Sequence, residues 1–253
     1  MDTKKLRQKV LDLAIRGKLV PQDPNDEPAS VLLERIREEK ERLIKEGKIK
    51  RDKKEKTSDK IPYEKVPFEL PKGWVWCKLE EVSFKIFDGP FGSHLKTADY
   101  TVNGVRVIRL ENLGEMKFIE QKETFISEEK YRTIEKHTVY EGDIIIGSFL
   151  ADGVKCVVLP EIKQIAIAKA DCFTIRIDQS LLSNKYLMYL LSSYPMYLQL
   201  SQFLKGMTRA RINATQLKTI LIPLPPLAEQ HRIISKIEKI FTQLDEIENS
   251  IKA

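Results

Sequence analysis

The chain has 253 residues, of which 42% are hydrophobic, so it can bury a core and is not a disordered protein. Its net charge of +6 permits a nucleic-acid partner without requiring one. The three cysteines are scattered and no stretch approaches about eighteen apolar residues, which argues against disulfides, a metal site and a membrane span, and predicts a cytoplasmic protein without a membrane partner.

Residues 1–60 are predicted to form two helices and a charged linker. Apolar residues spaced three or four apart predict helices over 3–16 and 29–47, with Gly17 as the C-cap of the first. Residues 48–60 are dense in charge and poor in core residues. They predict a linker, with a basic nucleic-acid arm as the alternative.

Residues 61–225 differ in composition and are predicted to form a domain of their own. A proline-rich segment leads into short, strand-like runs separated by Gly, Asp and Asn, a pattern typical of a β-rich sheet. The predicted strands cover 75–79, 105–110, 143–146, 155–159, 164–168 and 172–177. The predicted helices cover 128–136, 183–193 and 195–204.

Residues 226–253 predict a long helix with an apolar seam. Pro223, Pro225 and Pro226 end the preceding element, and Pro226 suits the first turn of the helix. The seam has the heptad spacing 4, 3, 4, 3, 4, which predicts a partner helix, and an ordinary terminal helix packed on the body is the alternative. Its residues are Ile233, Ile237, Ile240, Leu244, Ile247 and Ile251. The fold class is α+β, with a mixed, β-rich domain flanked by helices.

No catalytic constellation is present in the sequence. The three histidines stand apart, and there is no phosphate-binding Gly-Lys-Ser/Thr loop and no dinucleotide fingerprint. The pair Pro225-Pro226 is flanked by leucine on both sides, unlike the Asn/Asp-Pro-Pro-Tyr/Phe motif expected of an amino-group DNA methyltransferase. A non-catalytic protein with no cofactor or metal of its own is therefore predicted.

Two glycine-containing loops are the strongest candidates for binding. Residues 88–96 can bring backbone N–H groups and donor side chains to phosphate oxygens, and a tight strand connection is the alternative. Residues 205–213 carry guanidinium groups suited to phosphate or guanine and an amide suited to adenine, and a solvated loop is the alternative. The loop 147–155 and the run 105–110 add one residue each. The candidate nucleic-acid contacts are Ser93, His94, Lys96, Arg109, Lys155, Lys205, Thr208, Arg209, Arg211 and Asn213.

Four stretches resemble a known family. They are 11–24, 88–96, 206–213 and above all 222–230, which contains Pro-Leu-Pro-Pro-Leu-Ala-Glu-Gln and is followed by the long helix. In these stretches the chain resembles the DNA specificity (S) subunits of type I restriction-modification systems. Such a subunit is not an enzyme, and it holds two target-recognition domains apart on paired helices so that each reads half of a split DNA site.

The resemblance implies partners and an assembly. Double-stranded DNA, methylase (M) subunits that carry S-adenosylmethionine, and in some systems restriction (R) subunits are the expected partners. There is room here for a single target-recognition domain, and the loop 147–155 lacks the Thr-Arg-Thr-Gly type run expected of the family. A half-size subunit, or a fragment, is therefore suggested. Helices from both ends of the chain are expected to pack together at the spacer, and two copies are expected to pair as a homodimer through the seam and to read an interrupted palindrome.

Two other functions stay open at this point. The first is a scaffold that uses its heptads to join proteins and has no role with nucleic acid, which a titration against duplex DNA at several salt concentrations would distinguish. The second is an autonomous nuclease or methylase, which the missing motifs disfavour and which turnover by the purified chain alone would revive.

Overall fold

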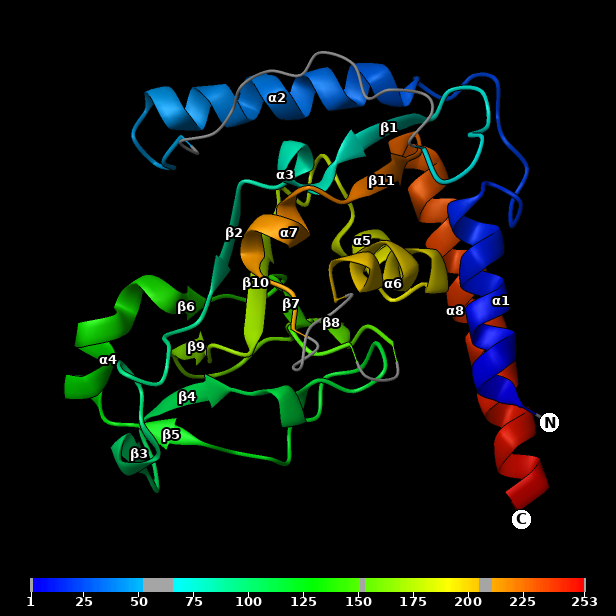
Figure 1. Cartoon of the computed structure of the whole chain (residues 1–253). Coiled ribbons are helices and arrows are strands. Elements are labelled where there is room, and N and C mark those ends of the chain that lie inside the picture. Colours follow the sequence, from blue (N-terminus) through cyan, green and yellow to red (C-terminus); the bar gives the residue numbers. More distant parts are fainter. Residues whose placement is uncertain (1, 52–65, 151–152, 205–210, 253) are drawn as a thin grey trace.

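The computed structural model describes residues 2–51, 66–150, 153–204 and 211–252. Figure 1 shows a helical pair on one side, a pair of sheets on the other and helices between them, so the α+β prediction is confirmed. The helices are α1 Thr3–Ile15, α2 Ala29–Lys45, α3 Leu79–Val82, α4 Glu128–Ile134, α5 Asn184–Leu191, α6 Tyr194–Ser201, α7 Ala214–Lys218 and α8 Leu227–Lys252. The strands are β1 Val75–Lys78, β2 Lys85–Asp88, β3 Tyr100–Thr101, β4 Val105–Ile108, β5 Phe125–Ile126, β6 Thr138–Val139, β7 Ile144–Gly147, β8 Cys156–Val158, β9 Ala166–Ala168, β10 Cys172–Arg176 and β11 Leu221–Leu224.

Three sheets organise the middle of the chain. The four-stranded sheet has the order β2-β10-β7-β8, and all of its pairs are antiparallel. The five-stranded sheet has the order β3-β5-β4-β9-β6 and contains one parallel pair, β4 with β9. The third sheet pairs β1 with β11, and it therefore joins the beginning and the end of the β-rich region.

The six predicted strand runs each contain a strand, whereas β2, β3, β5, β6 and β11 were not predicted. These strands have two to four residues each and depend on pairing with a neighbour rather than on a pattern of their own. The strand β11 corrects the expectation that prolines end the preceding element, because Pro223 pairs with Trp76 inside it. A proline is tolerated there because β11 lies at an edge and pairs only with β1.

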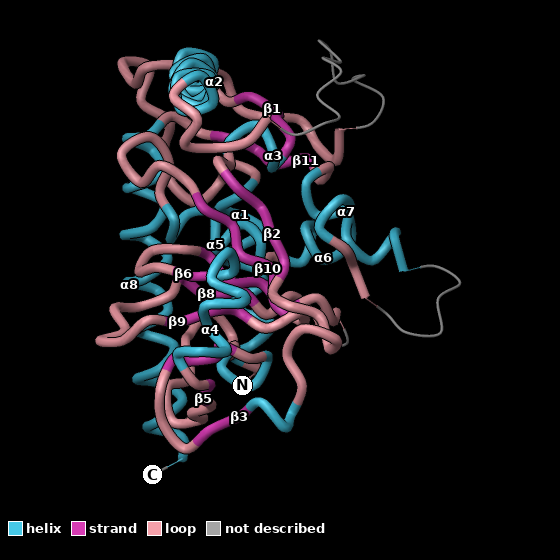
Figure 2. The backbone as a smooth tube through the Cα atoms, turned by 90° about the vertical axis from the view of Figure 1, so that its left-hand side faces the viewer, coloured by secondary structure: helices cyan, strands magenta, loops and turns pink. Residues whose placement is uncertain are grey.

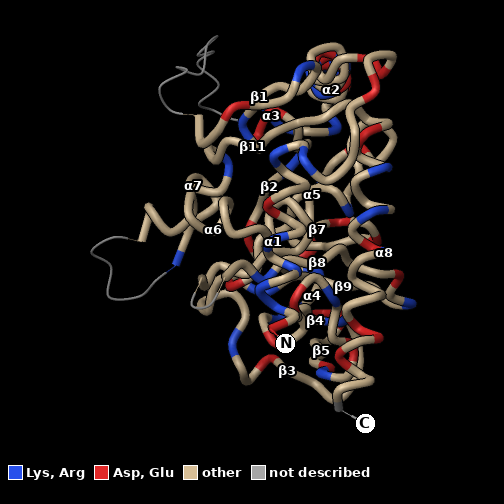
Figure 3. Tube along the Cα trace, turned by 90° about the vertical axis from the view of Figure 1, so that its right-hand side faces the viewer, with Lys and Arg blue, Asp and Glu red and all other residues tan. Residues whose placement is uncertain are grey.

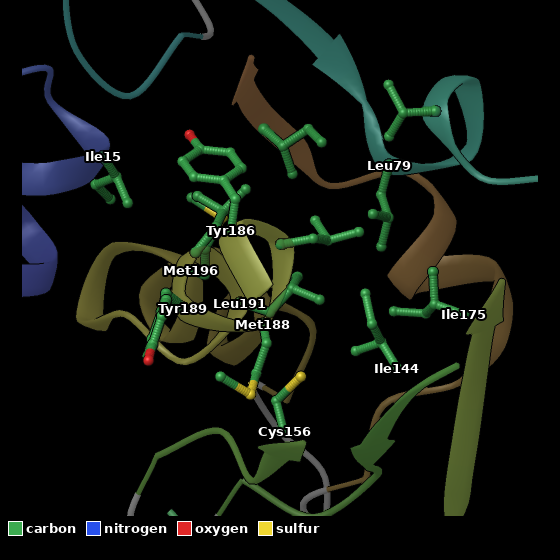
Figure 4. Close-up of a cluster of buried hydrophobic side chains, with 14 of the residues drawn as sticks. Ile15, Leu79, Ile144, Cys156, Ile175, Tyr186, Met188, Tyr189, Leu191 and Met196 are labelled. Atoms are coloured by element: carbon green, nitrogen blue, oxygen red, sulfur yellow. The ribbon is translucent and has the colours of Figure 1, made fainter. Parts of the chain in front are cut away.

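The helix α5 lies at the centre of the main core. Its residues from Tyr186 to Leu191 are all buried, and Ser183 caps its N-terminus by accepting from the backbone N–H of Tyr186. Figure 4 shows side chains of α5 and α6 lying between Ile15 of α1, Leu79 of α3 and the sheet residues Ile144 and Ile175. A helix that is apolar on every side must be covered on every side, so α5 brings the helical pair and the four-stranded sheet together.

The two ends of the chain form an antiparallel helical pair, α1 with α8, seen side by side in Figures 1 and 2. The Thr3 hydroxyl donates to Glu248 over 3.1 Å, and Arg7 pairs with Asp245 at 2.6 Å. We refer to α1 and α8 as the helical pair.

The apolar seam of α8 is divided by this packing. Ile233, Ile237 and Leu244 are buried in the core that also contains α1 and α5, and Ile240 packs against the same core in part. These residues are therefore not available to a second copy, which corrects the expectation that the whole seam faces one. Ile247 and Ile251 remain exposed, by 44% and 65%. No described helix combines the length and the apolar character needed to cross a membrane.

Two glycines give a matched test of the turn that follows α1. Gly17 and Gly47 have φ values of +64° and +72°, and each follows a helix whose last carbonyls accept from the next two N–H groups. Replacing Gly47 with alanine should cost about 1 kcal/mol, because only the backbone conformation is unfavourable and its Cβ meets no atom within 4 Å. Replacing Gly17 should cost about 1–3 kcal/mol more, because its Cβ would lie 2.3 Å from Cγ of Pro71. Urea unfolding measures both, and equal destabilisation would contradict the close approach of Pro71 to this turn.

Candidate nucleic-acid interface

The register of the four-stranded sheet brings the predicted binding loops to one edge. Asp88, at the end of β2, pairs with Phe173, and Gly147, at the end of β7, pairs with Cys172 at the start of β10. The loop after β2, the loop between β7 and β8 and the loop between β9 and β10 therefore lie at the same end of the strands. We call this end of the sheet the loop edge. The end of β4 also reaches it, because Ile108 pairs with Ala168 at the end of the parallel strand β9.

The loop after β2 carries three predicted contacts, and all are exposed. Gly89 begins the loop in contact with the backbone of Lys169, where a Cβ would lie 2.2 Å from the carbonyl carbon. The backbone N–H of His94 donates to the carbonyl of Phe91 over 2.8 Å, which forms a turn. The side chains of Ser93, His94 and Lys96 lie at or after this turn, open to solvent. Lys155, in the loop before β8, is also exposed.

Arg109 belongs to a small cluster of cations around one tyrosine. Its guanidinium lies 5.6 Å from the ring centroid of Tyr100, and Lys169 lies 5.2 Å from the same ring and donates to the tyrosine hydroxyl over 2.6 Å. Glu111 pairs with Arg109 at 2.9 Å and offsets part of its charge. Lys169 was not predicted, although its position between two predicted strands was a signal that it lies in a turn.

Arg211 is already in contact with other groups of the protein. It pairs with Asp171 in the β9–β10 turn, lies 4.5 Å from the ring centroid of Phe149, and forms a β-bridge with the backbone of that residue. This contact connects the segment before α7 to the loop edge. It also means that Asp171 competes with any phosphate for this guanidinium.

Asn213 is the N-cap of α7. Its side-chain oxygen accepts from the backbone N–H of Gln216 over 2.9 Å, and the Gln216 side chain accepts in return from the backbone of Asn213. The amide that was expected to read adenine is thus engaged in starting a helix. The other predicted contacts of this stretch, Lys205, Thr208 and Arg209, lie outside the described residues.

Figures 2 and 3 show α7 on the side of the molecule away from α8. Figure 3 also shows that residues of both charge signs are mixed over α2 and α8.

Two ionisable side chains near the sheets, Cys172 and His137, have pKa values that burial shifts. Burial raises the pKa of the Cys172 thiol to about 12, so this thiol stays protonated at neutral pH. Nδ1 of His137 lies 2.7 Å from the carbonyl oxygen of Asp88, and burial lowers the pKa of this imidazole. Within the described ranges no cluster of His, Cys, Asp and Glu could hold a metal ion.

Comparison with known sequences identifies the family. The sequence model of the type I restriction modification DNA specificity domain matches residues 43–253. The chain belongs to this family. It is 34% identical over 254 residues to the type I restriction enzyme EcoAI specificity subunit of Escherichia coli, an alignment that covers 98% of this chain and 41% of the relative. It is 33% identical over 258 residues to the EcoEI specificity subunit of the same organism, covering 98% and 42%. The specificity-domain chain thus spans about two fifths of the length of these curated relatives.

Two solved structures share the fold. A chain from work on complex assembly and conformational transition of the type I R-M system has a TM-score of 0.55 and 21% identity, with 98% of this chain and 54% of that chain covered. The HsdS subunit from Thermoanaerobacter tengcongensis has a TM-score of 0.52 and 19% identity, with 99% and 53% covered.

Asn213 offers a test of the specificity-domain chain's candidate site. Asn213→Ala should lower the free energy of unfolding by about 1 kcal/mol because the cap of α7 is removed, whereas Asn213→Asp should leave it nearly unchanged because aspartate caps equally well. Thr215→Ala, an exposed position in the same helix, is the control. Chemical denaturation measures all three. If Asn213→Asp destabilises as much as Asn213→Ala, the capping role is wrong.

Proposed function

We propose that this chain is a non-catalytic specificity subunit that reads one half of a split DNA site with its loop edge. We refer to residues 66–225, which carry this edge, as the DNA-reading domain. The observation that carries the proposal is the sheet register, which places four sequence-distant loops side by side in a chain of the specificity family. Loops held at the edge of a rigid sheet are suited to recognition, because the sheet fixes their positions while their side chains remain free to meet a ligand.

The cations of the loop edge divide into two kinds. Lys96 and Lys155 are exposed, and Lys169 is half-buried against Tyr100. These lysines are suited to phosphate contacts, which position a domain on DNA and supply affinity that weakens with salt. Arg109 and Arg211 already have carboxylate neighbours, and such ion pairs hold a guanidinium in one orientation, as base reading requires.

Two copies are proposed to assemble into a unit that reads both half-sites. Ile247 and Ile251 extend the α8 seam beyond its buried part and stay exposed on the 26-residue helix. A helix of this length spans about 39 Å, close to one turn of DNA. A two-fold dimer would read the same half-site twice, so the target would be an interrupted palindrome. Methylase subunits carrying S-adenosylmethionine, and in some systems restriction subunits, would supply the chemistry.

Removing charge from the loop edge tests DNA binding. The double variant Lys96→Ala, Lys155→Ala should bind the duplex that is methylated in cells more weakly. The slope of log affinity against log salt should become less negative by about 0.9 for each phosphate that is no longer neutralised. The matched control is Lys45→Ala, Lys239→Ala, which removes the same charge from exposed positions on α2 and α8. Equal salt slopes for the two double variants would argue that the loop edge does not bind DNA. A flat response of the unmodified chain would favour a protein-binding scaffold.

Exposed apolar residues on α8 test the assembly. The double variant Ile247→Asp, Ile251→Asp should be monomeric in sedimentation at concentrations where the unmodified chain is dimeric, with an unchanged melting temperature, because both side chains lie outside the core. Val31→Asp, an exposed apolar position on α2, is the control. A dimer that persists in the double variant, or an asymmetric methylation motif that depends on this chain, would contradict the two-fold assembly.

A further inference from the structure

Two neighbouring polar side chains are completely enclosed where the chain leaves the DNA-reading domain and enters α8. Glu229 and Gln230, in the first turn of the helix, are exposed by only 1% and 0%. Buried polar groups are costly unless they are hydrogen-bonded, so the partners of these two residues restrict how the surrounding segments can be arranged.

Glu229 connects the residue before β1 to the segment that follows α1. Its Oε2 accepts from the indole N–H of Trp74 over 2.9 Å, and its Oε1 accepts from the amide of Gln22 over 3.2 Å. The same Gln22 nitrogen also donates to the carbonyl of Gly17 over 2.6 Å. Burial raises the pKa of Glu229, and the two donors partly offset this effect. One carboxylate thus joins the start of α8 to the segment after α1 and to the residue that precedes β1.

Gln230 connects α8 to the central helix. Its Oε1 accepts from the backbone N–H of Ser183, the N-cap of α5, over 3.0 Å. Its Nε2 donates to the carbonyl of Pro225 over 3.1 Å, at the exit from β11. The side chain therefore holds both the covered helix of the core and the segment by which the chain reaches α8.

A carboxylate is required at position 229 and an amide at position 230. Glu229 faces two donors and needs two acceptors, whereas Gln230 faces one donor and one acceptor and needs one of each. Glutamine at 229 would oppose one N–H with another, and glutamate at 230 would oppose a carbonyl with a carboxylate. The order Glu-Gln is thus determined by the groups around it.

These contacts provide directional information that the apolar core lacks. The hydrophobic attraction between α5 and the helical pair is non-directional. Hydrogen bonds, in contrast, are all satisfied in one arrangement only, because their distances and angles are narrow. We propose that Glu229 and Gln230 are positioning residues that hold the DNA-reading domain at one angle on the helical pair, and so determine the spacing at which the dimer accepts its two half-sites. The spacing consequence rests on the proposed function, and the angle does not.

A distance measurement tests the angle directly. Spin labels on Lys163→Cys and Lys239→Cys, exposed positions in the DNA-reading domain and on α8, report their separation by double electron–electron resonance. The three native cysteines are buried and do not compete for the label. Labelled chain is diluted with unlabelled chain so that distances are within one copy. Glu229→Gln and Gln230→Glu should broaden or shift the distance distribution.

The control is a carboxylate-to-amide change inside the DNA-reading domain, away from α8. Asp143 is 4% exposed and accepts from Arg176 at 2.6 Å inside the domain. Asp143→Asn should lower the melting temperature without broadening the distribution. Gln22→Ala, at an exposed position, provides a mild variant that will fold even if a buried substitution does not, and it should broaden the distribution to a smaller extent. Distributions for Glu229→Gln, Gln230→Glu and Gln22→Ala as narrow as that of the unmodified chain would overturn the inference.

A second readout concerns spacing. Duplexes carrying the two half-sites at the natural separation, and one base pair closer or farther, are compared in binding competition. The preference for the natural separation should fall about fivefold or more in Glu229→Gln, the change expected when one buried hydrogen bond is removed, and stay unchanged in Asp143→Asn. An unmodified chain with no spacing preference would contradict the proposed function, whereas an unchanged distance distribution contradicts the inference itself.

Discussion

The burial of α5 is the constraint on which the rest of this structure depends. Six consecutive side chains, Tyr186 to Leu191, are withdrawn from water, so the helix must be covered on all sides. The helical pair supplies one wall and the four-stranded sheet supplies another, with Ile15 and Ile144 facing α5 from the two sides (Figure 4). Because one core includes both walls, the sheet that carries the loop edge and the helical pair belong to one packed body.

The cations of the loop edge differ in whether they have a carboxylate partner. Arg211 is held by Asp171 and Phe149, and Arg109 by Glu111 and Tyr100, whereas Lys96 and Lys155 extend into solvent. An arginine with a carboxylate partner keeps its orientation, and a solvated lysine adapts to a phosphate wherever it lies. This division supports separate roles for the two residue types in recognising and in positioning DNA.

The two ends of the chain pack together, because α1 lies antiparallel on α8. Contacts from Thr3 to Glu248 and from Arg7 to Asp245 join one end of the pair, and the buried carboxylate of Glu229 joins the start of α8 to Trp74, just before β1. A chain that spans two fifths of its relatives therefore forms a helical pair by itself. The exposed end of α8, with Ile247 and Ile251, is the part that we propose meets a second copy.

The sequence by itself determined six of the strands, the principal helices and the motifs that mark the family, because periodicity and turn residues act locally. It also indicated most of the loops that carry the candidate site. Only the tertiary structure decided that Asn213 caps a helix, that Asp171 binds Arg211 and that Lys169 joins the site. It also decided that Ile233 and Ile237 of α8 are buried in a core shared with α1 and α5. A heptad spacing specifies that a helix needs an apolar partner. Which helix becomes that partner depends on contacts more than two hundred residues apart, and no local pattern contains them.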